Sequence, residues 1–117
     1  SSDRVIVLDE LLTFYWDRHP HNKPLSLALV NVVLHSWATS DVDPELALER
    51  SQVIWDRVRA HLKNKIPLDN TFYNTMLNVF AKAGRAKEAE EFLEDMIQEY
   101  WDTIEIRKKQ DDGIDNQ

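Results

Sequence analysis

Apolar residues recur at steps of three and four in five segments of the chain, and polar residues fill the positions between them. Steps of this length place the apolar side chains on one face of an α-helix, so the pattern predicts helices rather than strands. The second segment is apolar around most of its circumference, which indicates a helix that is packed on more than one side. The predicted helices cover about residues 3–17, 27–39, 44–62, 70–83 and 85–108.

Proline and glycine mark the ends of these helices. The segment 20–24 begins and ends with proline, which removes a backbone donor and disfavours helical geometry in the residue before it. Asp43 followed by Pro44 is typical of a helix start, with Asp43 as the N-cap. Gly84 lies just past the fourth apolar run, where glycine tolerates the left-handed conformation. Residues 109–117 lack apolar support, so we expect a frayed tail there.

Composition narrows the classes of function that the chain can have. Its 117 residues, 43% of them hydrophobic, are enough for one domain-sized core. The absence of cysteine excludes disulfides, thiolate zinc sites and a cysteine nucleophile. Two glycines and four prolines leave little room for the many turns of an all-β fold. The longest uncharged stretch, residues 24–40, is shorter than the roughly 20 apolar residues of a membrane span. We therefore expect one all-α domain over residues 1–117.

Few residues offer catalytic or metal-binding chemistry. His19 and His21 lie in the loop after the first helix, but a structural zinc site needs about four ligands and nothing nearby completes one. The paired acids Glu90 and Glu91 lie in an acidic helix, where we expect solvation rather than acid–base catalysis. Serine, histidine and aspartate are present, but without the strand-borne elbow of a nucleophile. We expect no enzymatic activity, no cofactor, no metal site and no small-molecule substrate.

The formal net charge of −7 is unevenly distributed along the chain. Residues 1–83 contain 9 basic and 10 acidic residues, whereas residues 84–117 contain 5 basic and 11 acidic residues. The second predicted helix has no charged residue, and the fourth has only Lys82. The acidity is thus typical of a solvated outer face of the last helix. With one lysine on the two nearly neutral helices, we expect this chain alone to bind nucleic acid only weakly.

The chain contains an internal repeat. Residues 30–37 align with residues 73–80 at an offset of 43, which sets Asn31 opposite Asn74. The third and fifth helices align at an offset of 38, and the first helix repeats their internal spacing. The difference of five residues fits an insertion in the loop 40–44. These alignments predict half a repeat followed by two helical hairpins.

A specific set of motifs lies within residues 69–96. Tyr-Asn-Thr at 73–75 opens one helix, Lys-Ala-Gly-Arg at 82–85 makes the turn, and Glu-Ala at 88–89 precedes Met96 in the next helix. This set resembles the pentatricopeptide repeat (PPR) family. The resemblance covers about 90 residues but is close over only about a quarter of the chain.

The resemblance implies a right-handed α-solenoid of helix-turn-helix repeats with about five helices. Residues 3–17 are then the second helix of a truncated repeat. Residues 25–69 are a degenerate repeat with a loop insertion, and residues 70–108 are a PPR-like repeat with a long last helix. In such a solenoid the first helix of each hairpin lines the concave side.

The resemblance also implies binding of single-stranded RNA, in which each repeat reads one base with a few side chains. Asn31 and Asn74 would contact bases, and Asp69 would close the first repeat beside Asn31, a pair that favours uracil. Lys82 would lie near the RNA backbone. Ile104 stands where the second repeat is expected to carry an amide or an acid. Two repeats contact about two bases, so adjacent repeats or a protein partner are expected. The chain would then be part of a longer protein or assembly.

The family acts mostly in mitochondria and chloroplasts, on the processing, stability or translation of transcripts. The resemblance therefore implies an organellar location, although these residues contain no recognisable targeting segment.

Two alternatives stay open. The amides of Asn31 and Asn74 are equally suited to capping or bridging neighbouring helices. The chain also suits a protein-interaction scaffold or a structural subunit, with a peptide or helix bound in the uncharged groove or against Tyr100 and Trp101. Trp101 lies beyond the apolar face of the last repeat and is expected to be exposed, whereas the other three tryptophans are expected in the core.

Overall fold

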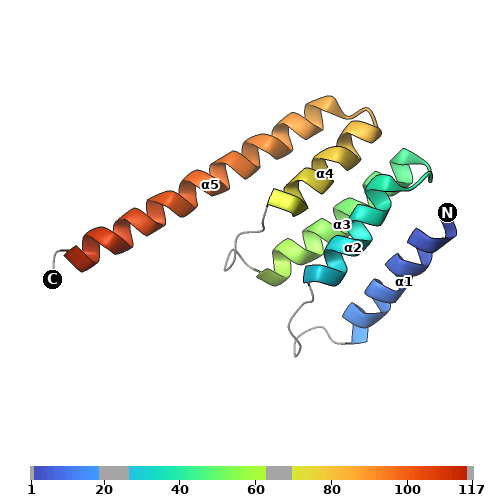
Figure 1. Cartoon of the computed structure of the whole chain (residues 1–117), viewed down its shortest axis with the longest axis horizontal. Helices are drawn as coiled ribbons and strands as arrows, with labels where there is room; N and C mark the ends of the chain where they lie inside the picture. Colours follow the sequence, from blue (N-terminus) through green and yellow to red (C-terminus); the bar gives the residue numbers. More distant parts are fainter. Residues whose placement is uncertain (1, 19–26, 63–69, 116–117) are drawn as a thin grey trace.

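The computed structural model describes residues 2–18, 27–62 and 70–115, and within these ranges the secondary structure is entirely helical (Figure 1). Five helices follow one another in the described parts of the chain, as the apolar pattern predicts. They are α1 (Ser2–Arg18), α2 (Leu27–Thr39), α3 (Pro44–Leu62), α4 (Asn70–Lys82) and α5 (Ala86–Asp115).

The helices pack in sequence as helical hairpins. α2 contacts α1, α3 and α4, while α4 contacts α2, α3 and α5. The pair α2 and α4 is the most extensive, so the first helices of the two hairpins lie side by side. Figure 1 shows α1 and α5 at opposite sides of the array, with part of α5 projecting beyond the other helices. The fold is thus the all-α array of helical hairpins that the sequence predicts.

The core is centred on α2. Val30, Val33, Leu34 and Trp37 are all buried, on a helix that touches three others. This confirms the prediction that an uncharged, apolar helix is packed on more than one side. An aromatic cluster joins the second hairpin to α3, because the ring of Trp55 lies 5.1 Å from that of Tyr73 and 5.0 Å from that of Phe92.

Helix ends follow the predicted chemistry. Asp43 is the N-cap of α3: its Oδ1 accepts a hydrogen bond from Glu45 N at 3.2 Å and its carbonyl accepts one from Ala47 N. Gly84 ends the fourth helix with φ of 71°, and Arg85 N donates back to the carbonyl of Phe80 at 2.9 Å. This 6→1 bond is that of a Schellman motif, which requires a left-handed residue.

The last helix is longer than the apolar pattern predicts. α5 continues past the expected end near Lys108 to Asp115, so the expected frayed tail over residues 109–117 is helical as far as Asp115. The extension contains Lys109 and Gln110, which are good helix formers, together with Asp111, Asp112 and Gly113, which are not. Opposite charges also stand four residues apart in it, at Glu105 and Lys109 and at Arg107 and Asp111, a spacing that stabilises a helix without tertiary packing.

Two residues that stand at helical spacing from buried or half-buried apolar residues are exposed. Leu11 is 60% exposed and Leu93 is 38% exposed. Leu11 corresponds to Ile54 at an offset of 43, and Ile54 is buried because α3 contacts both α2 and α4. Among the described helices the backbone of α1 packs only against α2, and α1 reaches α3 through side chains, so one side of its apolar face stays open.

Candidate nucleic-acid interface

The paired helices α2 and α4 present two matching polar stripes. Each residue of one stripe stands 43 positions from its counterpart in the other. All are exposed except Asn31, which is half-buried. The stripe on α2 is Ala28, Asn31, His35 and Thr39, and that on α4 is Thr71, Asn74, Asn78 and Lys82.

This surface, which we call the α2–α4 face, is almost free of charge. Lys82 is its only charged side chain, because α2 has none and α4 has no other over the described residues. Its polar groups are amides, hydroxyls and one imidazole, which offer donors and acceptors to a nucleic-acid base or to a peptide. The face therefore suits a ligand that is recognised by hydrogen bonds rather than by charge.

Asn31 carries an unsatisfied acceptor. Its Oδ1 is buried, and no donor among the described residues reaches it. An unpaired buried carbonyl costs about 1–3 kcal/mol, so native structures usually supply a donor from protein, water or ligand. Asn74 is at the equivalent position of α4 but is exposed. The structure thus brings the two predicted base-contacting amides onto adjacent helices, in different environments.

Lys82 spans the two helices. Its Nζ donates a hydrogen bond to the carbonyl of Ser40 and lies 3.5 Å from that of Ala38, at the C-terminal end of α2. A cation at this position neutralises the negative end of the α2 dipole. Lys82 is therefore a helix-stabilising residue in the structure, and its contact with an RNA backbone stays a prediction.

Of the two other predicted positions, Asp69 and Ile104, the structure describes only Ile104. Asp69, expected to pair with Asn31, lies outside the described residues. Ile104 is half-buried in the middle of α5, so the position that closes the second repeat lies within a continuous helix. The second repeat therefore has an apolar side chain in a helix at the place where the first repeat has an acid.

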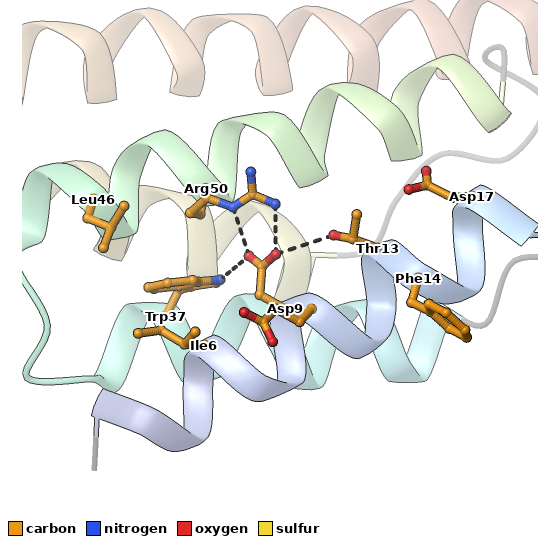
Figure 2. Close-up of a pocket in the computed structure, with 9 residues that line it drawn as sticks. Ile6, Asp9, Thr13, Phe14, Asp17, Trp37, Leu46 and Arg50 are labelled. Atoms are coloured by element: carbon orange, nitrogen blue, oxygen red, sulfur yellow. Dashed lines mark hydrogen bonds and ion pairs between the residues drawn. The ribbon is translucent and has the colours of Figure 1, made fainter.

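A pocket of about 530 Å³ lies elsewhere, between α1 and α3 over the ring of Trp37 (Figure 2). At its base the buried Asp9 accepts hydrogen bonds from Arg50 Nη2 at 2.7 Å and Nε at 3.1 Å, and from Trp37 Nε1 at 2.9 Å. Thr13 Oγ1 donates a fourth at 3.3 Å. Because every lone-pair direction of the carboxylate is used, we interpret this cluster as a structural clamp between helices.

Sequence analysis missed this clamp. Asp9 stands at a helical spacing from Val5, Leu12 and Trp16, all of which are buried. An acid on the inner face of an apolar helix is the pattern that would have revealed it. Its partner Arg50 is 41 residues away, so no local motif joins the two. The hydrogen bonds that the Arg50 guanidinium donates to Asp9 raise the pKa of Arg50 above its ordinary value.

A second buried network joins α3, α4 and α5. Arg59 Nη2 donates to Glu99 Oε1, and the hydroxyl of Tyr73 donates to Glu99 Oε2. Burial raises the pKa of the Tyr73 phenol, while the nearby Arg59 acts in the opposite direction. Tyr73 is the first residue of the Tyr-Asn-Thr motif, so the network fixes the helix that carries Asn74.

The predicted partner surface is exposed. Tyr100 is 64% and Trp101 is 55% exposed on α5, and their rings contact each other edge to face at 6.0 Å between centroids. Trp16 and Trp37 are buried and Trp55 is half-buried, so the tryptophans divide as the sequence predicts. What binds Tyr100 and Trp101 stays a prediction.

Metal and membrane sites were searched over the described ranges alone. Within residues 2–18, 27–62 and 70–115, no group of three or more His, Cys, Asp or Glu is placed to hold a metal ion. None of the described helices is both long and apolar enough to cross a membrane.

Two adjacent hairpins with matching first helices define a helical-repeat protein. A comparison with family models identifies the kind of repeat, because residues 71–100 match the PPR repeat. The chain therefore carries a PPR repeat, formed by α4 and the first half of α5. No curated protein and no solved structure matches the chain.

Proposed function

We propose that this chain binds single-stranded RNA along the α2–α4 face, with Asn31 and Asn74 contacting bases. The observation that carries the proposal is the placement of two amides at equivalent positions of the two most closely paired helices, in a chain with a PPR repeat. An amide offers a donor and an acceptor to the edge of one base. The Oδ1 of Asn31 is buried and unpaired, so contact with a base requires the amide to turn toward the α2–α4 face.

The two repeats differ in selectivity under this proposal. Asn31 acts with Asp69, a pair that favours uracil. Asn74 acts alone, because Ile104 supplies no hydrogen bond at the position that closes the second repeat. Selectivity for uracil is then greater at the first base than at the second.

Binding is weak and nearly independent of salt. A protein that neutralises Z phosphates of a single strand loses affinity with a slope of about −0.7Z against the logarithm of salt concentration. The α2–α4 face has one cation, Lys82, so the slope is expected to be no steeper than about −1. Useful affinity then requires neighbouring repeats or a partner protein.

The experiment is fluorescence anisotropy with short U-rich and A-rich RNAs at two salt concentrations. The Asn31→Ala and Asn74→Ala variants are expected to bind U-rich RNA more weakly, by about fivefold or more each. Gln110→Ala removes an exposed amide from α5 and serves as the matched control, with unchanged binding. Absence of binding at low salt, or equal binding by all three variants, would contradict the proposal.

The organellar role is part of the same proposal. PPR proteins act mostly in mitochondria and chloroplasts, so we place this chain in the RNA processing, stability or translation of one of these organelles. Subcellular fractionation of cells that express the intact protein tests this, and recovery outside both organelles would contradict it.

A protein-interaction scaffold is a second candidate, and one observation favours it. Val32 on α2 is 51% exposed, whereas its counterpart Thr75 on α4 is buried. Leu11 on the adjacent α1 is likewise exposed, whereas its counterpart Ile54 on α3 is buried. The face formed by α1 and α2 therefore suits an amphipathic helix, and reduced binding of such a helix by Leu11→Asp and Val32→Asp would support this function.

A further inference from the structure

The middle of α5 carries an apolar stripe that its own chain leaves open. Leu93, Ile97 and Tyr100 are exposed and Ile104 is half-buried, at steps of four, three and four residues. This is the spacing of the seam of a two-helix coiled coil. The stripe extends over about 16 Å at 1.5 Å per residue.

The packing of α5 against its own chain leaves room for this seam. α5 contacts α4, and its residues packed against the core are Ala89, Phe92 and Met96. Ile97 follows Met96 directly, so the seam is turned by about 100° from the covered face. A second helix can therefore lie along the stripe beside α4 without displacing it.

Charge is arranged asymmetrically on both sides of the stripe. Glu90 precedes it, and Arg107 and Lys108 follow it. The side chains of Glu90 and Arg107 are exposed, and no described hydrogen bond or ion pair within the chain involves them. The acidic and basic ends of one helix would thus match the opposite ends of an identical helix that runs the other way.

We propose that this stripe is a self-association surface on which α5 pairs antiparallel with α5 of a second copy of the chain. In the register that fills the seam, Ile97 lies opposite Tyr100 of the second copy, and Leu93 lies opposite its Ile104. Trp101 then lies beside the seam near Trp101 of the second copy. The two-fold axis makes every contact occur twice.

The same register pairs the charges at its two ends. Glu90 lies opposite Arg107 of the second copy. A parallel, in-register pair would instead place Glu90 opposite Glu90 and Arg107 opposite Arg107, which is repulsive. Self-complementarity of both the apolar and the charged positions is the reason for choosing a second copy over a different partner.

Sedimentation equilibrium of the full chain tests the proposal. A seam of this length is expected to give a reversible dimer with a Kd on the order of 10–100 µM. Glu90→Lys and Arg107→Glu are each expected to raise this Kd about tenfold, because each turns two symmetry-related attractions into repulsions. The double variant is expected to restore the original Kd.

The control is Lys109→Glu, the same kind of charge change two residues away on the outer side of the helix, which is expected to leave the Kd unchanged. Circular dichroism of each variant verifies that α5 remains helical. A chain that stays monomeric to about 0.5 mM contradicts the proposal. A dimer that Arg107→Glu does not weaken, or that the double variant does not restore, contradicts the antiparallel register.

Discussion

Arg50 on α3 and the buried Asp9 on α1 form a partly buried ion pair in which Nη2 lies 2.7 Å from Oδ1. The guanidinium also places Nε 3.1 Å from Oδ2, so the pair is bidentate. Two further contacts join the same helices and reinforce this ion pair. Arg57 Nη2 lies 3.1 Å from Asp17 Oδ1, and the Arg57 guanidinium stacks on the ring of Trp16. These contacts fix α1 on the repeat array.

Removal of the carboxylate should release α1. Asp9→Ala leaves Arg50 and the Trp37 N–H without their acceptor, so we expect the free energy of unfolding to fall by about 3 kcal/mol. Urea denaturation followed by circular dichroism measures this. The double variant Asp9→Leu with Arg50→Met removes both charges and is expected to recover most of the loss. Equal stability of Asp9→Ala and the native chain would show that the clamp is not structural.

Tyr73 makes stability depend on alkaline pH. Burial raises its pKa in the folded chain above the ordinary value of 10.0, which the unfolded chain retains. The stabilising contribution is complete below pH 10.0 and is lost as pH rises through the folded pKa, because the unfolded phenol releases its proton first. Tyr73→Phe cannot titrate, so the stability difference between native chain and variant should narrow as pH rises above 10.0. A constant difference over this range would exclude the effect.

Gly84 should be the costliest glycine to replace. Its φ of 71° disfavours any residue with a Cβ, although a Cβ there would meet no atom within 4 Å. Gly84→Ala is therefore expected to lower the free energy of unfolding by about 1 kcal/mol through the backbone alone. Thermal unfolding measures this, and a loss far above that value would point to a contact made by the turn.

Lys82 should affect folding and RNA binding separately. Lys82→Met removes the cation from the end of α2 and is expected to lower the free energy of unfolding by less than about 1 kcal/mol. If Lys82 also contacts the RNA backbone, the variant loses the small salt dependence of RNA binding. An unchanged salt slope would assign Lys82 to folding alone.

Local residue patterns were sufficient to predict the described helices and most of their ends. Asp43 and Gly84 act through the backbone of their immediate neighbours, so their sequence context determines the cap and the turn. The offset of 43 likewise predicts that Asn31 and Asn74 occupy equivalent positions of paired helices. These features need no knowledge of distant contacts.

Long-range contacts were not predictable in the same way. The helical spacing of Leu11 alone favours a core position, but whether Leu11 is buried depends on which helices surround α1. Asp9 and Arg50 meet only because α1 and α3 both pack on α2. The extra length of α5 was missed because polar residues that favour a helix resemble those of a solvated tail.

Titration of the isotopically labelled chain with a short U-rich RNA, followed by two-dimensional NMR, tests the central claim most directly. The side-chain amide signals of Asn31 and Asn74 report on the α2–α4 face, and that of Gln110 on α5 reports on the rest of the surface. We predict that the two asparagine signals shift with U-rich RNA, and less with A-rich RNA, while that of Gln110 stays in place. Shifts confined to α5 or to the pocket beside Asp9, or no shifts at all, would contradict RNA binding on this face.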